Sequence, residues 1–325
     1  MTRSDPLHYF GKLPSRGDFV RSAHSPSLTL SLDRWFSATL EAMAVDPRWK
    51  EVYDRAGPAR LAILGPRSGV ALAGHLIASH DASGRRFPFI TASRCTVEAS
   101  TAFVGQSPMR LWRPWQALAQ IGRKAVEEAD AEPWLAAMGT LQVPAPLTEP
   151  DPSEADFLDR QTLGSLESLL RAAGHEMDLR QALLGLGLLL QPVPASGVRT
   201  LERGLWLPLP RDPAWQALVA GWWLSLVAGF LGRADFELLL LLPAHAAEAP
   251  PLAVLGFGGP APRTLQAWLD PAAGHQVLID LRTSEWVEQH LGQDYAVHKL
   301  SRYLQQVDLS LSHAHTSFQE CFLGR

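Results

Sequence analysis

Cysteine is nearly absent from this sequence. The 325 residues include only Cys95 and Cys321, too few for a disulfide framework or a cysteine-based zinc site. The first residues, Met1 to Pro6, lack the apolar core of a secretory signal peptide, so we expect a cytoplasmic protein. An excess of positive charge is also absent. The 29 Lys and Arg residues stand against 33 Asp and Glu, which argues against a dedicated nucleic-acid-binding protein.

The common signatures of catalysis are missing as well. The sequence contains no Walker-type phosphate loop, no dinucleotide-binding glycine motif and no nucleophile elbow around a serine. Residues 256–260 superficially resemble a phosphate loop, but Pro260 removes a backbone donor that such a loop needs. We therefore expect no enzymatic activity, no cofactor and no catalytic residues. Because catalytic groups gather in space rather than in sequence, a hydrolase that uses both halves stays an alternative.

Isolated histidines and cysteines have structural explanations. On a strand, His313 and His315 would share one face, as metal ligands could, but no further ligands lie nearby at a suitable spacing. We therefore expect two surface histidines and no metal site. We expect His75 to face the core, His80 to lie in a turn and Cys95 to be a small buried thiol, although neighbouring Arg94 could activate it.

The distribution of charge and proline suggests two domains. Hydrophobic residues make up 46% of the chain, enough for a large core. Residues 1–150 carry a net charge of +3 and residues 151–325 one of −7, although a statistical spread could also produce this difference. Residues 143–153 hold four prolines among small and acidic residues. We predict a domain over residues 1–145, a linker over 143–153 and an acidic second domain over 155–325.

The first half alternates short strands with amphipathic helices. Short turns join its consecutive strands, which is typical of antiparallel pairing. The pattern therefore predicts an α+β domain, an α/β sandwich with a largely antiparallel central sheet flanked by helices. The expected strands cover residues 8–13, 61–64, 70–79 and 87–95, and the expected helices begin at residues 26, 49 and 108.

The second half reads as an α/β-type domain. Residues 215–231 carry no charge, but Gly221 and Gly229 interrupt them and no basic cluster flanks them, so a buried core helix is favoured over a membrane span. Core packing is also favoured over an interface for Trp206, Trp222 and Trp223. Helices are expected over residues 157–170, 179–190 and 294–309, and strands over 205–209, 237–242, 252–257 and 276–281.

Two polar clusters are the candidate partner-binding residues, because binding residues commonly lie in loops at strand ends. Arginine can pair with carboxylate or phosphate through its fork of donors. Alternatively, these side chains satisfy turns within the fold. The first cluster consists of Lys12, Ser15, Arg16, Asp18 and Arg21, and the second of Asp81, Ser83, Arg85 and Arg86.

The first cluster lies within a sequence signature. The decamer GKLPSRGDFV, residues 11–20, strongly resembles the N-terminal signature of the TagF/ImpM family of bacterial type VI secretion accessory proteins. Further matches follow in order at residues 32–35, 60–64 and 81–89, with Phe89 in place of a commoner leucine. The resemblance covers roughly residues 8–140.

This resemblance implies a function. It implies a cytoplasmic, non-enzymatic regulator that represses type VI secretion after translation by binding a forkhead-associated scaffold protein. It also implies a central sheet flanked by helices, in agreement with the strand pattern. A structural component of the secretion apparatus stays an alternative. We expect no nucleic-acid partner and no membrane insertion, and the sequence does not predict the oligomeric state.

Overall fold

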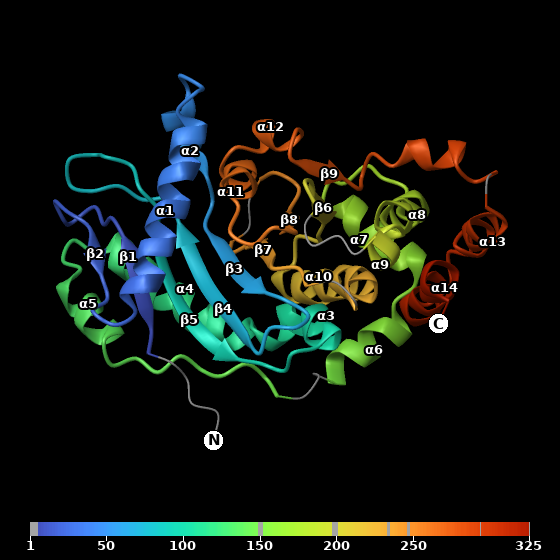
Figure 1. Ribbon diagram of the computed structural model, residues 1–325, viewed down its shortest axis with the longest axis horizontal. Coiled ribbons are helices and arrows are strands. Elements are labelled where there is room, and N and C mark those ends of the chain that lie inside the picture. The colour runs from blue at the N-terminus through green and yellow to red at the C-terminus, as the bar shows by residue number, and fades with distance from the viewer. Residues whose placement is uncertain are drawn as a thin grey trace.

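A single sheet runs through the protein (Figure 1). The computed structural model describes residues 6–148, 152–196, 201–232, 235–245, 248–292 and 294–324. Within these ranges the strands are β1 (His8–Gly11), β2 (Val20–Arg21), β3 (Ala59–Leu64), β4 (Val70–Ile77), β5 (Phe89–Thr96), β6 (Gly204–Pro208), β7 (Leu238–Pro243), β8 (Leu252–Gly256) and β9 (Leu278–Asp280). Their order across the sheet is β2-β1-β5-β4-β3-β7-β8-β6-β9. All neighbours pair antiparallel except β6 and β9, so the predicted α+β class is confirmed.

Helices cover both faces of this sheet. In the first half they are α1 (Pro26–Met43), α2 (Trp49–Arg55), α3 (Thr101–Arg110), α4 (Trp112–Glu127) and α5 (Glu132–Met138). In the second half they are α6 (Pro152–Arg160), α7 (Leu163–Ala172), α8 (Leu179–Leu190), α9 (Val193–Ser196), α10 (Pro213–Ala228), α11 (Pro262–Leu269), α12 (Pro271–Gly274), α13 (Tyr295–Tyr303) and α14 (Leu311–Leu323). Two short 3₁₀ helices are η1 (Gly229–Leu231) and η2 (Glu285–Gln289).

Polar side chains fix the start of several helices. Asp178 and Asp212 accept hydrogen bonds from the first turns of α8 and α10, and Ser310 does the same for α14. Thr162 and Ser165 form a capping box at the start of α7. This cap ends the continuous helix predicted over residues 157–170 and divides it into α6 and α7.

The sheet separates two hydrophobic cores, and the central strand β7 contributes side chains to both. Leu238, Leu240 and Leu242 point into one core, together with residues of α3, α4, α8, α10 and α14. Leu239 and Leu241 point into the other, together with residues of α1, α2 and α11. Because side chains alternate along a strand, an unbroken leucine run is what a strand covered on both faces requires.

The two halves of the chain share this sheet. β3 pairs with β7 along its whole length, from Ala59 opposite Pro243 to Leu64 opposite Leu238. In Figure 1 the light-blue β3 of the first half lies beside the orange β7 of the second half. The predicted linker at residues 143–153 lies partly outside the described residues. The chain segments before and after this linker both contribute strands to the one sheet.

The uncharged segment of the second half is a core helix, as predicted. Together α10 and η1 are long and apolar enough to cross a membrane, but 72% of their most apolar stretch is buried inside the fold. Trp222 and Trp223 are both buried, as is Trp206 on β6. The prediction that these tryptophans pack in the core is confirmed.

Other expectations differ from the structure near the ends of elements. The helix expected to extend to residue 309 ends at Tyr303, and β9 is shorter than the strand expected over residues 276–281. β2 was not expected. His313 and His315 lie on α14 and not on a strand, so the helical rotation of about 100° per residue sends them to different faces.

Candidate functional site

The two predicted polar clusters meet at Asp81. It lies in the turn after β4, and its side chain is fully removed from solvent. Its carboxylate accepts hydrogen bonds from the Lys12 ammonium group at 2.9 Å and from Arg85 Nε at 2.7 Å. The backbone N–H groups of Ser83 and Arg85, both at 3.0 Å, and the Ser83 hydroxyl at 2.8 Å donate to it as well. Two loops that the sequence shows separately therefore meet at one carboxylate.

These surroundings keep Asp81 ionised. Burial raises the pKa of its carboxyl group, because a charged form is disfavoured away from water. The hydrogen bonds from Lys12, Arg85 and Ser83 outweigh burial and hold the pKa well below its ordinary value. A carboxylate offers about four lone-pair sites, and the donors already present occupy both oxygens of Asp81. Its chemistry is that of a structural anchor for the two loops.

Backbone contacts complete the connection between the loops. The Ala82 N–H donates to the Arg16 carbonyl at 2.8 Å, and Arg85 Nη2 donates to the Gly17 carbonyl at 2.8 Å. The Ser79 hydroxyl donates to the Lys12 carbonyl, also at 2.8 Å. The loop after β1 is thus tied to the turn after β4 along most of its length.

Arg16 and Arg86 form ion pairs at the surface. The Arg16 guanidinium contacts Glu132 at the start of α5, and the Glu132 side chain is 69% exposed. Arg86 makes a two-pronged contact with Asp54 of α2, at 2.8 and 2.5 Å. The hydrogen bond from Arg86 lowers the pKa of Asp54. Solvent-exposed pairs of this kind contribute little to stability, so the fold does not depend strongly on either pair.

The remaining predicted residues lie beyond the Asp81 cluster. Asp18 is exposed and accepts a hydrogen bond from the Phe19 N–H at 2.8 Å. Arg21 is exposed on β2 and has no hydrogen-bond or ion-pair partner among the residues described. The Ser15 hydroxyl is buried, and no partner for it occurs in the described part of the chain. The structure therefore brings Lys12, Arg16, Asp81 and Arg85 together and leaves Ser15, Asp18, Arg21 and Arg86 around them.

Phe19 is an exposed aromatic residue that sequence reasoning missed. Its side chain is 42% exposed, yet its ring stacks on Phe10 at 5.7 Å and meets Phe87 edge-on at 4.8 Å. The Lys12 ammonium lies 5.0 Å from the centre of the same ring. The available signal was the position of Phe19, between the candidate residues Asp18 and Arg21.

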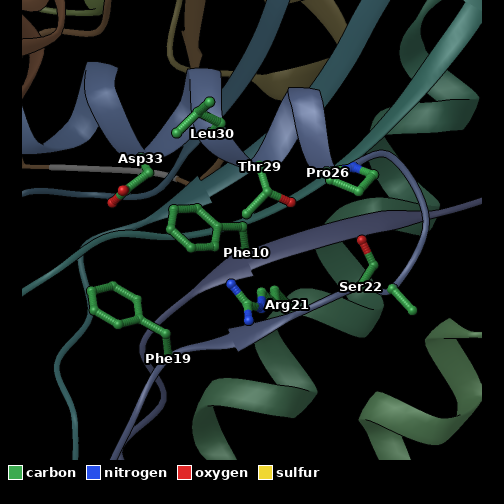
Figure 2. A pocket seen from close by; sticks show the side chains of 9 residues that line it. Phe10, Phe19, Arg21, Ser22, Pro26, Thr29, Leu30 and Asp33 are labelled. Atoms are coloured by element: carbon green, nitrogen blue, oxygen red, sulfur yellow. The ribbon is translucent and has the colours of Figure 1, made fainter.

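A groove opens beside Phe19 (Figure 2). α1 forms one wall through Pro26, Thr29, Leu30 and Asp33, while β1, β2 and the adjoining loops form the other. Phe10 lies at its floor and Arg21 at its β2 side. The groove has a volume of about 740 Å³ and lies at the end of the sheet, where β2 has no further strand beside it within the described residues.

The other polar residues considered from the sequence have the structural places expected for them. His75 is buried in β4, His80 lies in the turn that follows, and Cys95 is buried in β5. Burial, followed by the positive charges of Arg123 and Arg60, lowers the pKa of His75 to about 3. His75 is therefore neutral at physiological pH, and the expectation of a core-facing histidine is confirmed.

Comparison with known families identifies the domain in which these loops lie. Residues 8–141 match the model of the TagF N-terminal domain, which is described as type VI secretion system-associated. This part of the chain is a TagF domain. The TagF domain includes β1 to β5 and α1 to α5, and therefore every residue of the candidate site and of the groove. The family resemblance stated from the decamer is confirmed.

Two further comparisons add little beyond the TagF domain. No curated protein matches the chain. The crystal structure of PA0076 from Pseudomonas aeruginosa PAO1 is similar, with a TM-score of 0.46 and 19% sequence identity. That similarity covers 81% of this chain and 93% of PA0076.

Proposed function

We propose that this protein is a non-enzymatic regulator of a bacterial type VI secretion system. It acts in the cytoplasm after translation, and it represses secretion by binding a forkhead-associated scaffold protein of the system. The observation that carries this proposal is the TagF domain over residues 8–141, from a family associated with type VI secretion. The scaffold partner and the repressing direction come from the resemblance to the TagF/ImpM family.

The geometry of the candidate site supports binding rather than catalysis. The buried carboxylate of Asp81 is already occupied by Lys12, Arg85 and Ser83 and is held ionised. A general acid or base needs a pKa near the working pH, which this environment does not provide. The Asp81 contacts instead stiffen a surface loop. A stiff loop loses less conformational entropy when it binds, which favours recognition.

A binding measurement with the scaffold protein of the same bacterium tests the proposal. The two purified proteins are mixed at micromolar concentration and separated by size-exclusion chromatography, where we expect them to co-elute. Arg16→Glu and Arg86→Glu should each weaken the complex without lowering Tm by more than a few degrees, because both arginines form exposed ion pairs. Arg34→Glu makes the same charge change on exposed α1 and serves as the control.

The secretion phenotype tests the direction of regulation. Deleting a repressor should raise secretion by the system, whereas deleting a structural component should abolish it. Failure of the two folded proteins to associate at micromolar concentration would remove the direct scaffold mechanism. Loss of secretion on deletion would favour a role in assembly of the apparatus instead.

A further inference from the structure

The groove between α1 and β2 combines an apolar floor with two charges of opposite sign. Phe10, Phe19 and Leu30 supply apolar surface, and Leu30 is 50% exposed although it is a large apolar residue. Arg21 lies on the β2 wall and Asp33 on the α1 wall (Figure 2). Neither charge has a hydrogen-bond or ion-pair partner within the described residues. Most other charged side chains near the groove already form ion pairs, so Arg21 and Asp33 differ from them in being available to a ligand.

The ring of Phe19 is held in one position although it is partly exposed to solvent. Contacts with Phe10 and Phe87 and with the Lys12 ammonium fix its ring. Lys12 is in turn fixed by the buried carboxylate of Asp81. An exposed aromatic ring that is ordered before binding loses little side-chain entropy when it is covered. Buried aromatic anchors are also the residues that most often dominate binding energy.

We propose that this groove binds a short peptide segment of a protein partner, in which an apolar side chain is flanked by one acidic and one basic residue. The apolar side chain covers Phe19 and Leu30. The acidic residue pairs with Arg21, and the basic residue pairs with Asp33. Opposite charges on the two walls fix the direction of the segment as well as its position. The proposal rests on the proposed function, in that the segment belongs to the scaffold protein.

Lys12 and Asp81 are positioning residues in this arrangement. Neither is free to contact a partner, since each is buried and engaged with the other. Their role is to place Phe19 against the groove. The binding surface therefore lies beside the predicted polar cluster and shares Arg21 with it.

Isothermal titration of the scaffold protein into variants of the full chain tests the groove. Phe19→Ser should weaken binding about tenfold or more, as for a buried aromatic anchor. Arg21→Glu and Asp33→Lys should each weaken binding severalfold at low salt and less at high salt, because exposed charges are screened. Arg34→Glu and Glu41→Lys make the same two charge changes at exposed positions of α1 outside the groove, and they should bind as the wild type does.

Leu30→Ser provides a second apolar variant. Phe19 packs on two other rings, so its replacement could lower the fraction of folded protein, whereas Leu30 is half exposed on a helix surface. Circular dichroism melting establishes that each variant is folded at the titration temperature. A folded Leu30→Ser variant with severalfold weaker binding supports the groove.

Each result has a definite meaning. If the wild type binds and all groove variants bind equally well, the groove proposal is wrong and the proposed function stands. If the folded wild type does not bind the scaffold, the proposed function fails and the assignment of this peptide fails with it. If the wild type instead forms a dimer that Phe19→Ser dissociates, the groove is occupied by a second copy, which overturns the partner-peptide assignment.

Discussion

The ammonium group of Lys12 lies 2.9 Å from the carboxylate of Asp81, and the exposed fractions of the two side chains are 9% and 0%. This ion pair joins the loop that follows β1 to the turn that follows β4. The two partners depend on it unequally. Asp81 also accepts hydrogen bonds from Ser83 and Arg85, whereas the other contact of the Lys12 ammonium is the ring of Phe19.

This inequality predicts which replacement is more harmful. Lys12→Met keeps the apolar stem and leaves Asp81 with its remaining donors, so we expect a loss of about 1–3 kcal/mol in the free energy of unfolding. Asp81→Leu leaves a buried ammonium group without a carboxylate, which is the more destabilising way to break a buried pair. Urea denaturation should therefore give the order wild type, Lys12→Met, Asp81→Leu. If Lys12→Met were less stable than Asp81→Leu, Asp81 would not be the residue that anchors the two loops.

Two of the buried histidines, His8 and His75, predict a loss of stability in mild acid. Burial, together with repulsion from His24, lowers the pKa of His8 to about 4, and burial lowers that of His75 to about 3. Between these values and the ordinary value of 6.5, the unfolded chain binds protons that the folded protein does not. Stability is therefore complete above pH 6.5 and falls as the pH decreases. For one such imidazole the fall from pH 7 to pH 4 is on the order of 3 kcal/mol.

His75→Leu isolates one of these contributions. The substitution has a similar volume and removes a group that stays neutral inside the fold over this pH range, so the loss of unfolding free energy between pH 7 and pH 4 should become markedly smaller. His298→Leu, at an exposed position of α13, should leave the pH dependence as it is. Denaturation curves at several pH values give the measurement. Asp81 acts in a separate range, because its lowered pKa makes its contribution disappear only below the ordinary carboxyl value.

Most of the fold could be predicted from local patterns. The amphipathic pattern that begins at residue 26 predicted α1, and the short turns between β3, β4 and β5 predicted antiparallel pairing. The leucine run of β7 indicated a buried strand. Its neighbour could not be predicted, since β3 and β7 are far apart in sequence and strand pairing depends on the whole fold. β2 was missed because a strand of two residues, Val20 and Arg21, has no periodicity to detect.

The candidate site shows the same division between local and spatial information. The clusters around Lys12 and Asp81 could be recognised locally, as polar residues in loops that follow predicted strands. That these clusters share one carboxylate depends on β1 lying next to β5 and β5 next to β4, which only the fold determines. The groove required the same information, because Leu30 and Asp33 come from α1 whereas Phe19 and Arg21 come from β2 and its preceding loop.

The contact between α3 and α10 predicts how strongly the two halves of the chain depend on each other. A Cβ atom added at Gly105 would lie 3.0 Å from the Cα atom of Ser225, so any larger residue requires the two helices to move apart by at least a few tenths of an ångström. Gly105→Val must push α3 and α10 apart, and we expect a loss of about 1–3 kcal/mol. Ala102→Val adds a branched side chain at an exposed position of the same helix and should cost much less.

The number of unfolding transitions of Gly105→Val tests whether the shared sheet couples the two halves of the chain. Because β3 pairs with β7 along its whole length, loosening one half should loosen the other. We therefore expect calorimetry of Gly105→Val to show one transition at a lower Tm, as for a single cooperative unit. Two separated transitions, with only one of them shifted by the substitution, would instead mean that the halves unfold independently and that the β3–β7 pairing contributes little to holding them together.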